Sequence, residues 1–160
     1  MTGSQHNAQD DRLAMLESRL GSLLDEAGEL MDQLQAVGDQ QRHAIESGQV
    51  AQIVEVVAKR EPLVQSMIRV GEELGAFIED PETKSDLPDR TLNAALKRIA
   101  GYEHTMKRLR EQDARDQLQM EKTRDQLASQ LAGMGSGQNA LRAYSTRTPT
   151  PNPILQDREG

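Results

Sequence analysis

Apolar residues recur at alternating spacings of three and four near the start of the chain. This seam consists of Leu13, Leu16, Leu20, Leu23, Ala27, Leu30, Leu34 and Val37. A heptad repeat keeps one narrow face of a helix turned toward a partner helix, so this helix cannot bury its seam alone. Leu24, Met31 and Ile45 widen the seam on one flank, which favours a helical bundle over a simple two-stranded coil.

The first predicted helix runs from about residue 11 to residue 46. Ser47 and Gly48 then interrupt the pattern. Residues 1–10 are polar and have little to bury, so we expect them to be disordered.

A second apolar pattern at helical spacing runs from Val50 to Ile78. Pro62 lies inside it. Because proline lacks an amide hydrogen and its ring clashes with the preceding turn, we expect a kink near residues 58–62. Residues 79–89 contain two prolines and several turn-favouring residues, which predict a loop.

A third helix is predicted from about residue 90 to residue 133. Its seam weakens through Asp113, Asp116 and Gln117 and resumes at Met120. Such a polar gap has three explanations: the stretch extends beyond its partners, it lies between register shifts, or a second molecule covers it.

The glycine-rich run GMGSG at 133–137 predicts a break and a flexible joint, followed by a short helix over 138–144. The remaining tail has prolines at alternate positions and is expected to be extended and disordered. The predicted organisation is a helical domain over 11–134 and a flexible segment over 135–160. The predicted fold is all-α: an elongated antiparallel helical bundle or coiled coil of three long helices.

Composition agrees with a slender helical protein. Only 2% of the 160 residues are aromatic, and Ala, Leu, Glu, Gln and Arg are abundant, as in long helices. There is no cysteine, which excludes disulfides and thiolate metal sites. No apolar run approaches the length of a membrane-spanning helix, and the first residues lack the features of a secretory signal. We therefore expect a cytoplasmic protein without membrane insertion.

Charge is unevenly distributed along the chain. Residues 1–90 hold 8 Lys and Arg against 18 Asp and Glu, and residues 91–160 hold 11 against 8, which gives the net charge of −7. The acidic first part disfavours nucleic acid and anionic membranes. Opposite charges are interleaved along the third predicted helix, which is typical of pairing in water rather than of membrane-surface binding.

The sequence offers little catalytic chemistry. The three histidines are His6, His43 and His104, and His43 stands three residues before Glu46, so these two side chains could meet on one helix face. A metal site needs three or four ligands, so we expect neither metal nor cofactor. The GMGSG run follows a helix and lacks the Lys-Ser/Thr continuation of a phosphate loop. We expect that the chain is not an enzyme.

Two adjoining segments carry a recognisable pattern: residues 41–49 read QRHAIESGQ and residues 50–64 read VAQIVEVVAKREPLV. These segments resemble the bacterial flagellar export chaperones of the FlgN and FliT type. The family has an "Arg-x-Ala-Leu, small-Gly-Asp" helix end followed by a helix with "Leu-x-x-Leu-x-x-Lys-Glu-x-Leu-Leu". Gln49 stands where the family has Asp, and Pro62 where many members have a helix former. Residues 140–144, ALRAY, are similar to the C-terminal part of some FlgN-like proteins.

The resemblance implies a chaperone of bacterial flagellum biogenesis and type III secretion. Such a chaperone binds an unassembled hook-associated (hook-filament junction) protein in the cytoplasm, prevents its premature assembly and delivers it to the export apparatus. Junction proteins are the clients of the FlgN branch and the filament cap is the client of the FliT branch. Export gate or export ATPase components are further candidate partners.

An incomplete seam on the third helix is the predicted client-binding surface, since a client helix can complete it. Its methionines suit an adaptable surface, although methionine is equally an ordinary core residue. The predicted client-binding residues are Met106, Leu109, Met120, Leu127, Leu131, Met134, Leu141 and Tyr144. We further hypothesise that the joint at 133–137 lets the 138–144 segment cover the seam when no client is bound.

Two other classes of function fit the same pattern. The chain fits a structural coiled-coil scaffold or homodimer, with no transient client. It also fits a regulatory partner that binds a folded protein, such as a transcription factor or an ATPase subunit.

Overall fold

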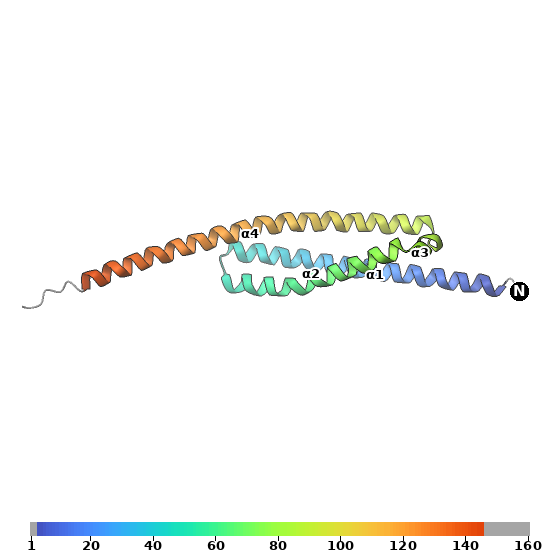
Figure 1. Ribbon diagram of the computed structural model, residues 1–160, viewed down its shortest axis with the longest axis horizontal. Helices are drawn as coiled ribbons and strands as arrows, with labels where there is room; N and C mark the ends of the chain where they lie inside the picture. Colours follow the sequence, from blue (N-terminus) through green and yellow to red (C-terminus); the bar gives the residue numbers. More distant parts are fainter. Residues whose placement is uncertain (1–2, 146–160) are drawn as a thin grey trace, which may run out of the picture. The chain divides into compact units, whose positions relative to one another are not determined.

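The computed structural model describes the backbone of residues 3–145, together with all side chains in that range except those of residues 136, 138–141 and 143–145. Four helices and no strand occur there: α1 (Gly3–Glu46), α2 (Val50–Glu79), α3 (Pro81–Asp86) and α4 (Asp89–Ser145) (Figure 1). The all-α class is therefore confirmed. No helix in this range combines the length and apolarity needed to cross a membrane.

Helix α1 begins earlier than predicted. The sequence predicts disorder over residues 1–10, whereas the helix starts at Gly3, and residues 1–2 lie outside the described part. Residues 4–12 are exposed and gain no burial from being helical. The helix extends through them because no proline stops it, and each residue added to an existing helix gains one backbone hydrogen bond.

The turn between α1 and α2 lies where the sequence places it. Gly48 has a φ of 67°, in the left-handed region that favours glycine. The amide groups of Gly48 and Gln49 donate to the carbonyl groups of Ile45 and Ala44 at 3.1 and 3.2 Å. These bonds satisfy carbonyls that the last turn of α1 would otherwise leave unpaired.

Helix α2 contains Pro62 without interruption, and its ribbon curves along its length (Figure 1). The predicted loop over 79–89 is wrong in one respect, because it contains the short helix α3. Asp80 starts this helix: its carboxylate accepts hydrogen bonds from the amide and the hydroxyl group of Thr83, both at 2.9 Å. Asp80, one of the turn-favouring residues of this segment, is therefore the N-cap of α3.

Helix α4 continues through the glycine-rich run at 133–137 and ends at Ser145. The predicted break, the flexible joint and the separate helix over 138–144 are therefore wrong. Each glycine costs about 1 kcal/mol relative to alanine in a helix interior but, unlike proline, keeps its amide hydrogen bond. The helix tolerates this cost, and the hypothesis that a flexible joint closes over the seam loses its structural basis.

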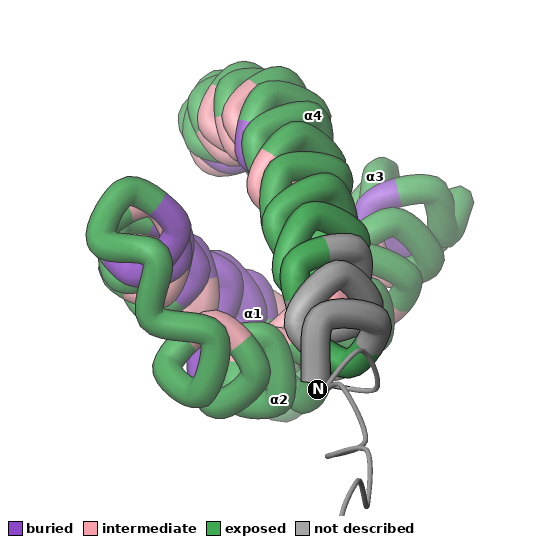
Figure 2. The backbone as a smooth tube through the Cα atoms, turned by 90° about the vertical axis from the view of Figure 1, so that its left-hand side faces the viewer, coloured by how far each residue is buried: buried purple, intermediate pink, exposed green. Residues whose placement is uncertain are grey.

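The chain divides into two units, Met1–Met120 and Glu121–Gly160, which are described separately. In the first unit α1 supplies most of the buried positions, seen as the purple segments of Figure 2. The main core cluster consists of Leu20, Leu23, Leu24, Leu74, Ile78, Leu87 and Ala95. Three of these residues belong to the predicted seam of the first helix and its flank, which confirms that the seam packs against other helices.

Ion pairs between α1 and α2 show that these two helices run in opposite directions. Arg19 pairs with Glu73 at 3.0 Å, and Glu26, further along α1, pairs with Arg69, earlier in α2, at 2.7 Å. Both pairs lie at the surface of the first unit, where an ion pair contributes little to the free energy of unfolding. Their main effect is therefore to specify how the two helices are aligned.

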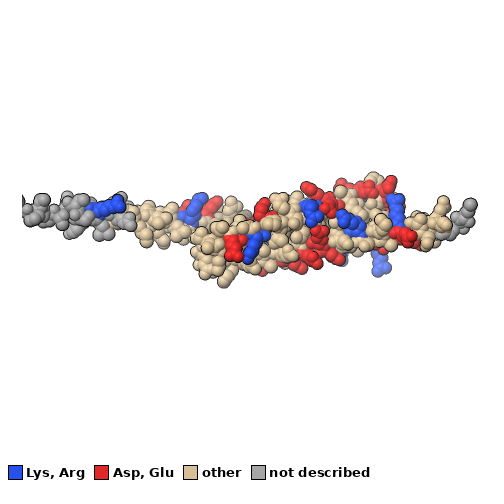
Figure 3. Space-filling view, turned by 90° about the horizontal axis from the view of Figure 1, so that it is seen from below, with Lys and Arg blue, Asp and Glu red and all other residues tan. Residues whose placement is uncertain are grey.

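Polar contacts between α1 and α4 show that these helices run in the same direction. The hydroxyl of Thr91 donates to Glu17 at 3.2 Å, and Arg98, two turns further along α4, donates to Asp25, two turns further along α1, at 3.2 Å. On the face shown in Figure 3, Lys and Arg side chains lie beside Asp and Glu side chains. This mixture agrees with the solvated charged faces predicted from the sequence.

Candidate functional site

The polar gap in the third-helix seam forms a buried hydrogen-bonded layer in the first unit. Asp116 of α4 is 4% exposed and accepts from the amide of Gln41 of α1, which is 2% exposed, at 3.0 Å, and from Gln112 at 2.8 Å. Arg60 of α2 forms an ion pair with Asp113 and also reaches Gln41 at 3.5 Å. Polar side chains of α1 and α2 therefore cover Asp113 and Asp116 without a second molecule, whereas Gln117 is exposed.

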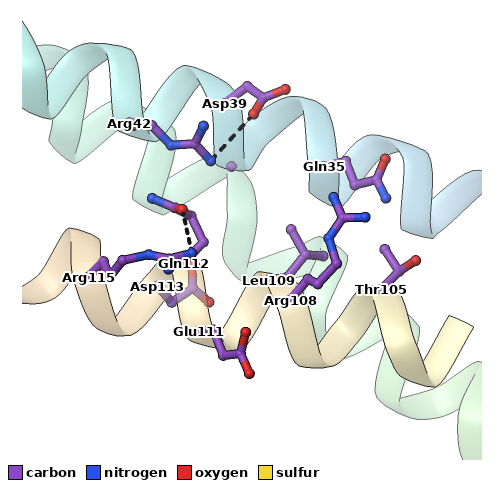
Figure 4. Close-up of a pocket in the computed structure, with 11 residues that line it drawn as sticks. Gln35, Asp39, Arg42, Thr105, Arg108, Leu109, Glu111, Gln112, Asp113 and Arg115 are labelled. Atoms are coloured by element: carbon purple, nitrogen blue, oxygen red, sulfur yellow. Dashed lines mark hydrogen bonds and ion pairs between the residues drawn. The ribbon is translucent and has the colours of Figure 1, made fainter.

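On one side of this layer, α1 and α4 enclose a polar cleft of about 330 Å³ (Figure 4). Arg42 pairs with Asp39 at 3.7 Å, and Arg115 donates to Gln112 at 3.0 Å. In Figure 4 the Glu111 side chain points away from α1. Since the cleft is lined mainly by charged and amide groups, it offers little apolar surface to a partner.

On the other side, α2 and α4 border an apolar groove, called here the α2–α4 groove. It consists of two adjoining hollows of about 340 and 510 Å³, which share Met67, Met106 and Arg110. Ala27 of α1 contributes to the larger hollow. The other residues that line the groove are Arg60, Val64, Ile68, Gly71, Leu74 and Gly75 of α2, Ile99, Tyr102, Glu103, Leu109 and Asp113 of α4, and Leu34 and Gly38 of α1.

Two glycines leave the α2 wall of this groove open. A Cβ atom built on Gly71 or Gly75 meets no atom within 4 Å. These residues are one helical turn apart and therefore lie on the same face of α2. Ile68, at the edge of the groove, is 50% exposed. The groove therefore presents apolar surface that the described part of the chain leaves uncovered.

Hydrogen bonds hold the α4 wall in place at Tyr102. Its hydroxyl donates to the carbonyl of Leu24 at 3.0 Å and accepts from Arg98 at 3.0 Å. The hydrogen bond to Tyr102, together with that to Asp25, raises the pKa of the Arg98 guanidinium. Tyr102 also packs against the main core cluster, so a side chain held by packing and by its hydroxyl group gives this part of the groove a defined shape.

The structure brings some of the predicted client-binding residues together. Met106 and Leu109 are half-buried and line the α2–α4 groove. Met120 is also half-buried, but it does not line either hollow.

The other five predicted residues belong to the second unit. Leu127, Leu131 and Met134 are 45%, 67% and 67% exposed and lie on one face of α4, by their spacing of four and three. We call these three residues the C-terminal stripe. Leu141 and Tyr144 lie in helical backbone, but their side chains are outside the described part.

The α2 contribution to the groove is not evident from the sequence. Met67 belongs to the apolar pattern of the second helix, which does not distinguish a core position from a groove position, and Ile68 lies beside that pattern. The only signal for an open wall was the four-residue spacing of Gly71 and Gly75, which is weak without knowledge of the neighbouring helix.

Within the described residues, no group of three or more His, Cys, Asp or Glu side chains is placed to hold a metal ion. The chain matches no protein-family model, no curated protein and no solved structure.

Proposed function

We propose that this chain is a flagellar type III export chaperone of the FlgN/FliT type. It binds an unassembled hook-filament junction protein in the cytoplasm, prevents premature assembly and delivers the client to the export apparatus. The resemblance of residues 41–64 to that family supports the assignment. Export gate or export ATPase components are its further proposed partners.

The α2–α4 groove is the observation that carries the proposal. It is a mainly apolar surface between two long helices, with Met67 and Met106 shared by its two hollows. An amphipathic helix binds such a surface by burying its own apolar face. Methionine is unbranched and adapts to differently shaped side chains, which suits a surface that holds a client temporarily.

The proposal includes a three-helix antiparallel bundle as the framework of the first unit. The opposite direction of α1 and α2 and the common direction of α1 and α4 support an up-down-up arrangement. In this arrangement α1 is the central helix, and the groove is the side on which a fourth helix would complete the packing. The chain acts by binding and not by catalysis.

Co-purification with a candidate junction protein tests the proposal. Ile68→Lys places a charge at the edge of the groove, and Val54→Lys makes the same change on α2 at a residue that is 65% exposed and outside the groove. We expect the wild type and Val54→Lys to retain the junction protein and Ile68→Lys to lose it. Failure of the wild type to retain any junction protein contradicts the proposal, as does equal retention by the two variants.

A structural homodimer is the second candidate, and the C-terminal stripe favours it. Exposed apolar residues at heptad spacing bury their surface well against an identical helix. Light scattering separates the two candidates: a stable dimer that binds no junction protein supports the scaffold, whereas a monomer that forms a complex with a junction protein supports the chaperone.

A further inference from the structure

The rim of the α2–α4 groove carries charges that the chain does not neutralise. Glu103 and Arg110 line the larger hollow, and neither forms an ion pair within the described residues. They lie seven residues, or about two helical turns and 10 Å, apart along α4. The larger hollow is thus acidic at Glu103 and basic at Arg110, where it adjoins the smaller hollow. In the smaller hollow Arg60 and Asp113 neutralise each other.

We infer that the groove binds one amphipathic helix of a partner protein, with a basic residue facing Glu103 and an acidic residue facing Arg110. This inference rests on the proposed function and names the chemistry of the client segment. The partner helix carries an apolar stripe between the two charged residues, which lie about seven residues apart, since they must match a spacing of two turns on α4.

The open glycines determine where the large apolar side chains of the partner lie. Gly71 and Gly75 leave two recesses one turn apart on the α2 wall, opposite Tyr102 and Met106 in the same hollow. Knobs-into-holes packing places large side chains in such recesses. Two apolar residues one turn apart on the partner helix therefore fill them.

A second copy of this chain fits the groove less well than a partner helix does. The C-terminal stripe of a second copy has no charged residue between Leu127 and Met134 to pair with Glu103 and Arg110. The residues of a second α4 that do carry opposite charges seven positions apart are Glu103 and Arg110 themselves, and they line that copy's own groove. Two grooves placed face to face leave the open space at Gly71 and Gly75 unfilled, so a partner helix that fills this space and pairs with both charges suits the groove better.

Binding of a synthetic helical peptide to the full chain tests the inference. The probe is a peptide of roughly 20 residues with a leucine stripe at heptad positions and one Lys and one Glu seven residues apart beside it. A neutral version has Gln at both charged positions. We expect the charged peptide to bind about two- to fivefold more tightly, the range of a surface ion pair, and this difference to disappear in 1 M salt.

Variants of α4 test the charge complementarity. Glu103→Lys is expected to remove the preference for the charged peptide, because it sets two cations against each other. Glu111→Lys is the matched control, since Glu111 lines the α1–α4 cleft instead of the groove. Likewise Arg110→Glu is compared with Arg108→Glu, which also lines that cleft. Equal effects of the groove and cleft variants overturn the inference.

A glycine pair tests the recesses independently of charge. Gly71→Leu fills the groove from within and is expected to weaken binding of either peptide at least about tenfold, the loss expected for excluding one large apolar side chain. Gly101→Leu is the control: its Cβ also meets no atom within 4 Å, but Gly101 is outside the groove. Circular dichroism verifies that both variants are folded. Unchanged binding by Gly71→Leu overturns the inference.

The inference and the proposed function fail in distinguishable ways. Peptide binding that follows the variants, without retention of any junction protein, supports the inference and contradicts the chaperone assignment. Conversely, a groove occupied by a second copy is detected by light scattering, because wild type would then be a dimer and Gly71→Leu a monomer. That result overturns the inference.

Discussion

The side-chain amide of Gln41 donates to the carboxylate of Asp116 at 3.0 Å, and the two side chains are only 2% and 4% exposed. The residues lie 75 positions apart, on α1 and α4. Since both side chains are buried beyond the reach of water, each provides the hydrogen-bond partner that the other needs. The pair therefore fixes how far α4 is shifted along α1, in the way that a buried polar residue specifies register in a coiled coil.

Breaking this pair is expected to destabilise the protein. Asp116→Ala leaves the buried amide of Gln41 without an acceptor, which costs about 1–3 kcal/mol of the unfolding free energy. Replacing both partners, with Gln41→Leu and Asp116→Leu, is expected to restore most of that loss, because the buried pair is removed as a whole, Arg60 keeps its ion pair with Asp113, and Gln112 is only half-buried. Urea unfolding of Gln41→Leu, Asp116→Leu and the double variant measures the coupling. Additive effects, without a coupling of about 1 kcal/mol or more, contradict the role of the pair.

The contrast between seam and groove shows what periodicity predicts. Leu20, Leu23 and Ala27 are buried as the heptad pattern requires, because the pattern returns to the same face of the helix about every two turns. The groove depends on which helices become neighbours, and this information is not local. Met106 and Leu109 were identified because their own helix shows the seam, whereas the opposite wall belongs to another helix.

Helix ends and the polar layer show where the sequence pattern is insufficient. The start of α1 at Gly3 and the passage of α4 through 133–137 depend on helix propagation, which the pattern of buried residues does not record. Asp116 interrupts the seam when its helix is considered alone. Its hydrogen-bond partner Gln41 is a polar residue in another helix. Only the packing of α1 against α4 explains why these two polar residues are buried.

Two glycines of α1 are expected to respond oppositely to alanine. At Gly28 a Cβ would lie 2.9 Å from the hydroxyl oxygen of Tyr102, whereas at Gly21 it meets nothing within 4 Å. Gly21→Ala therefore stabilises the helix by up to about 1 kcal/mol. Gly28→Ala displaces the Tyr102 hydroxyl from its hydrogen bond with Leu24, which offsets this gain by about 1 kcal/mol or more.

Removing the hydroxyl group tests this explanation. With Tyr102→Phe, the nearest atom to the new Cβ is the ring carbon Cζ, at 3.6 Å, which is an ordinary contact. Gly28→Ala is then expected to stabilise the Tyr102→Phe protein as Gly21→Ala stabilises the wild type. Thermal unfolding of the four proteins decides the matter, and a Gly28→Ala effect that is the same in both backgrounds contradicts it.

The cap of α3 predicts a pH dependence of stability. Hydrogen bonds from the amide and hydroxyl groups of Thr83 lower the pKa of Asp80 below its ordinary value of about 3.9. The ionised form is thus favoured in the folded state. Its contribution to stability is fully present above the unfolded-state pKa and is lost as the pH falls through the lowered folded-state pKa.

Asp80→Asn isolates this contribution, because asparagine caps a helix without titrating. The difference in melting temperature between wild type and Asp80→Asn is expected to be constant above about pH 5 and to change in favour of Asp80→Asn between about pH 4 and pH 2. If the melting temperatures of the two proteins change in parallel with pH, the Asp80 carboxylate does not contribute to the pH dependence of stability.

The C-terminal stripe is expected to matter for binding and not for stability. Leu131 and Met134 are both 67% exposed, so Leu131→Gln with Met134→Gln changes the unfolding free energy by no more than about 0.5 kcal/mol each. If the stripe belongs to the client-binding surface, the double variant binds a junction protein about tenfold more weakly, since two apolar side chains no longer become buried on binding. Ala132→Gln, at an exposed position between them on the same helix, is the control. Calorimetric titration measures the affinities, and equal binding by the double variant and the control would confine the client-binding surface to the α2–α4 groove.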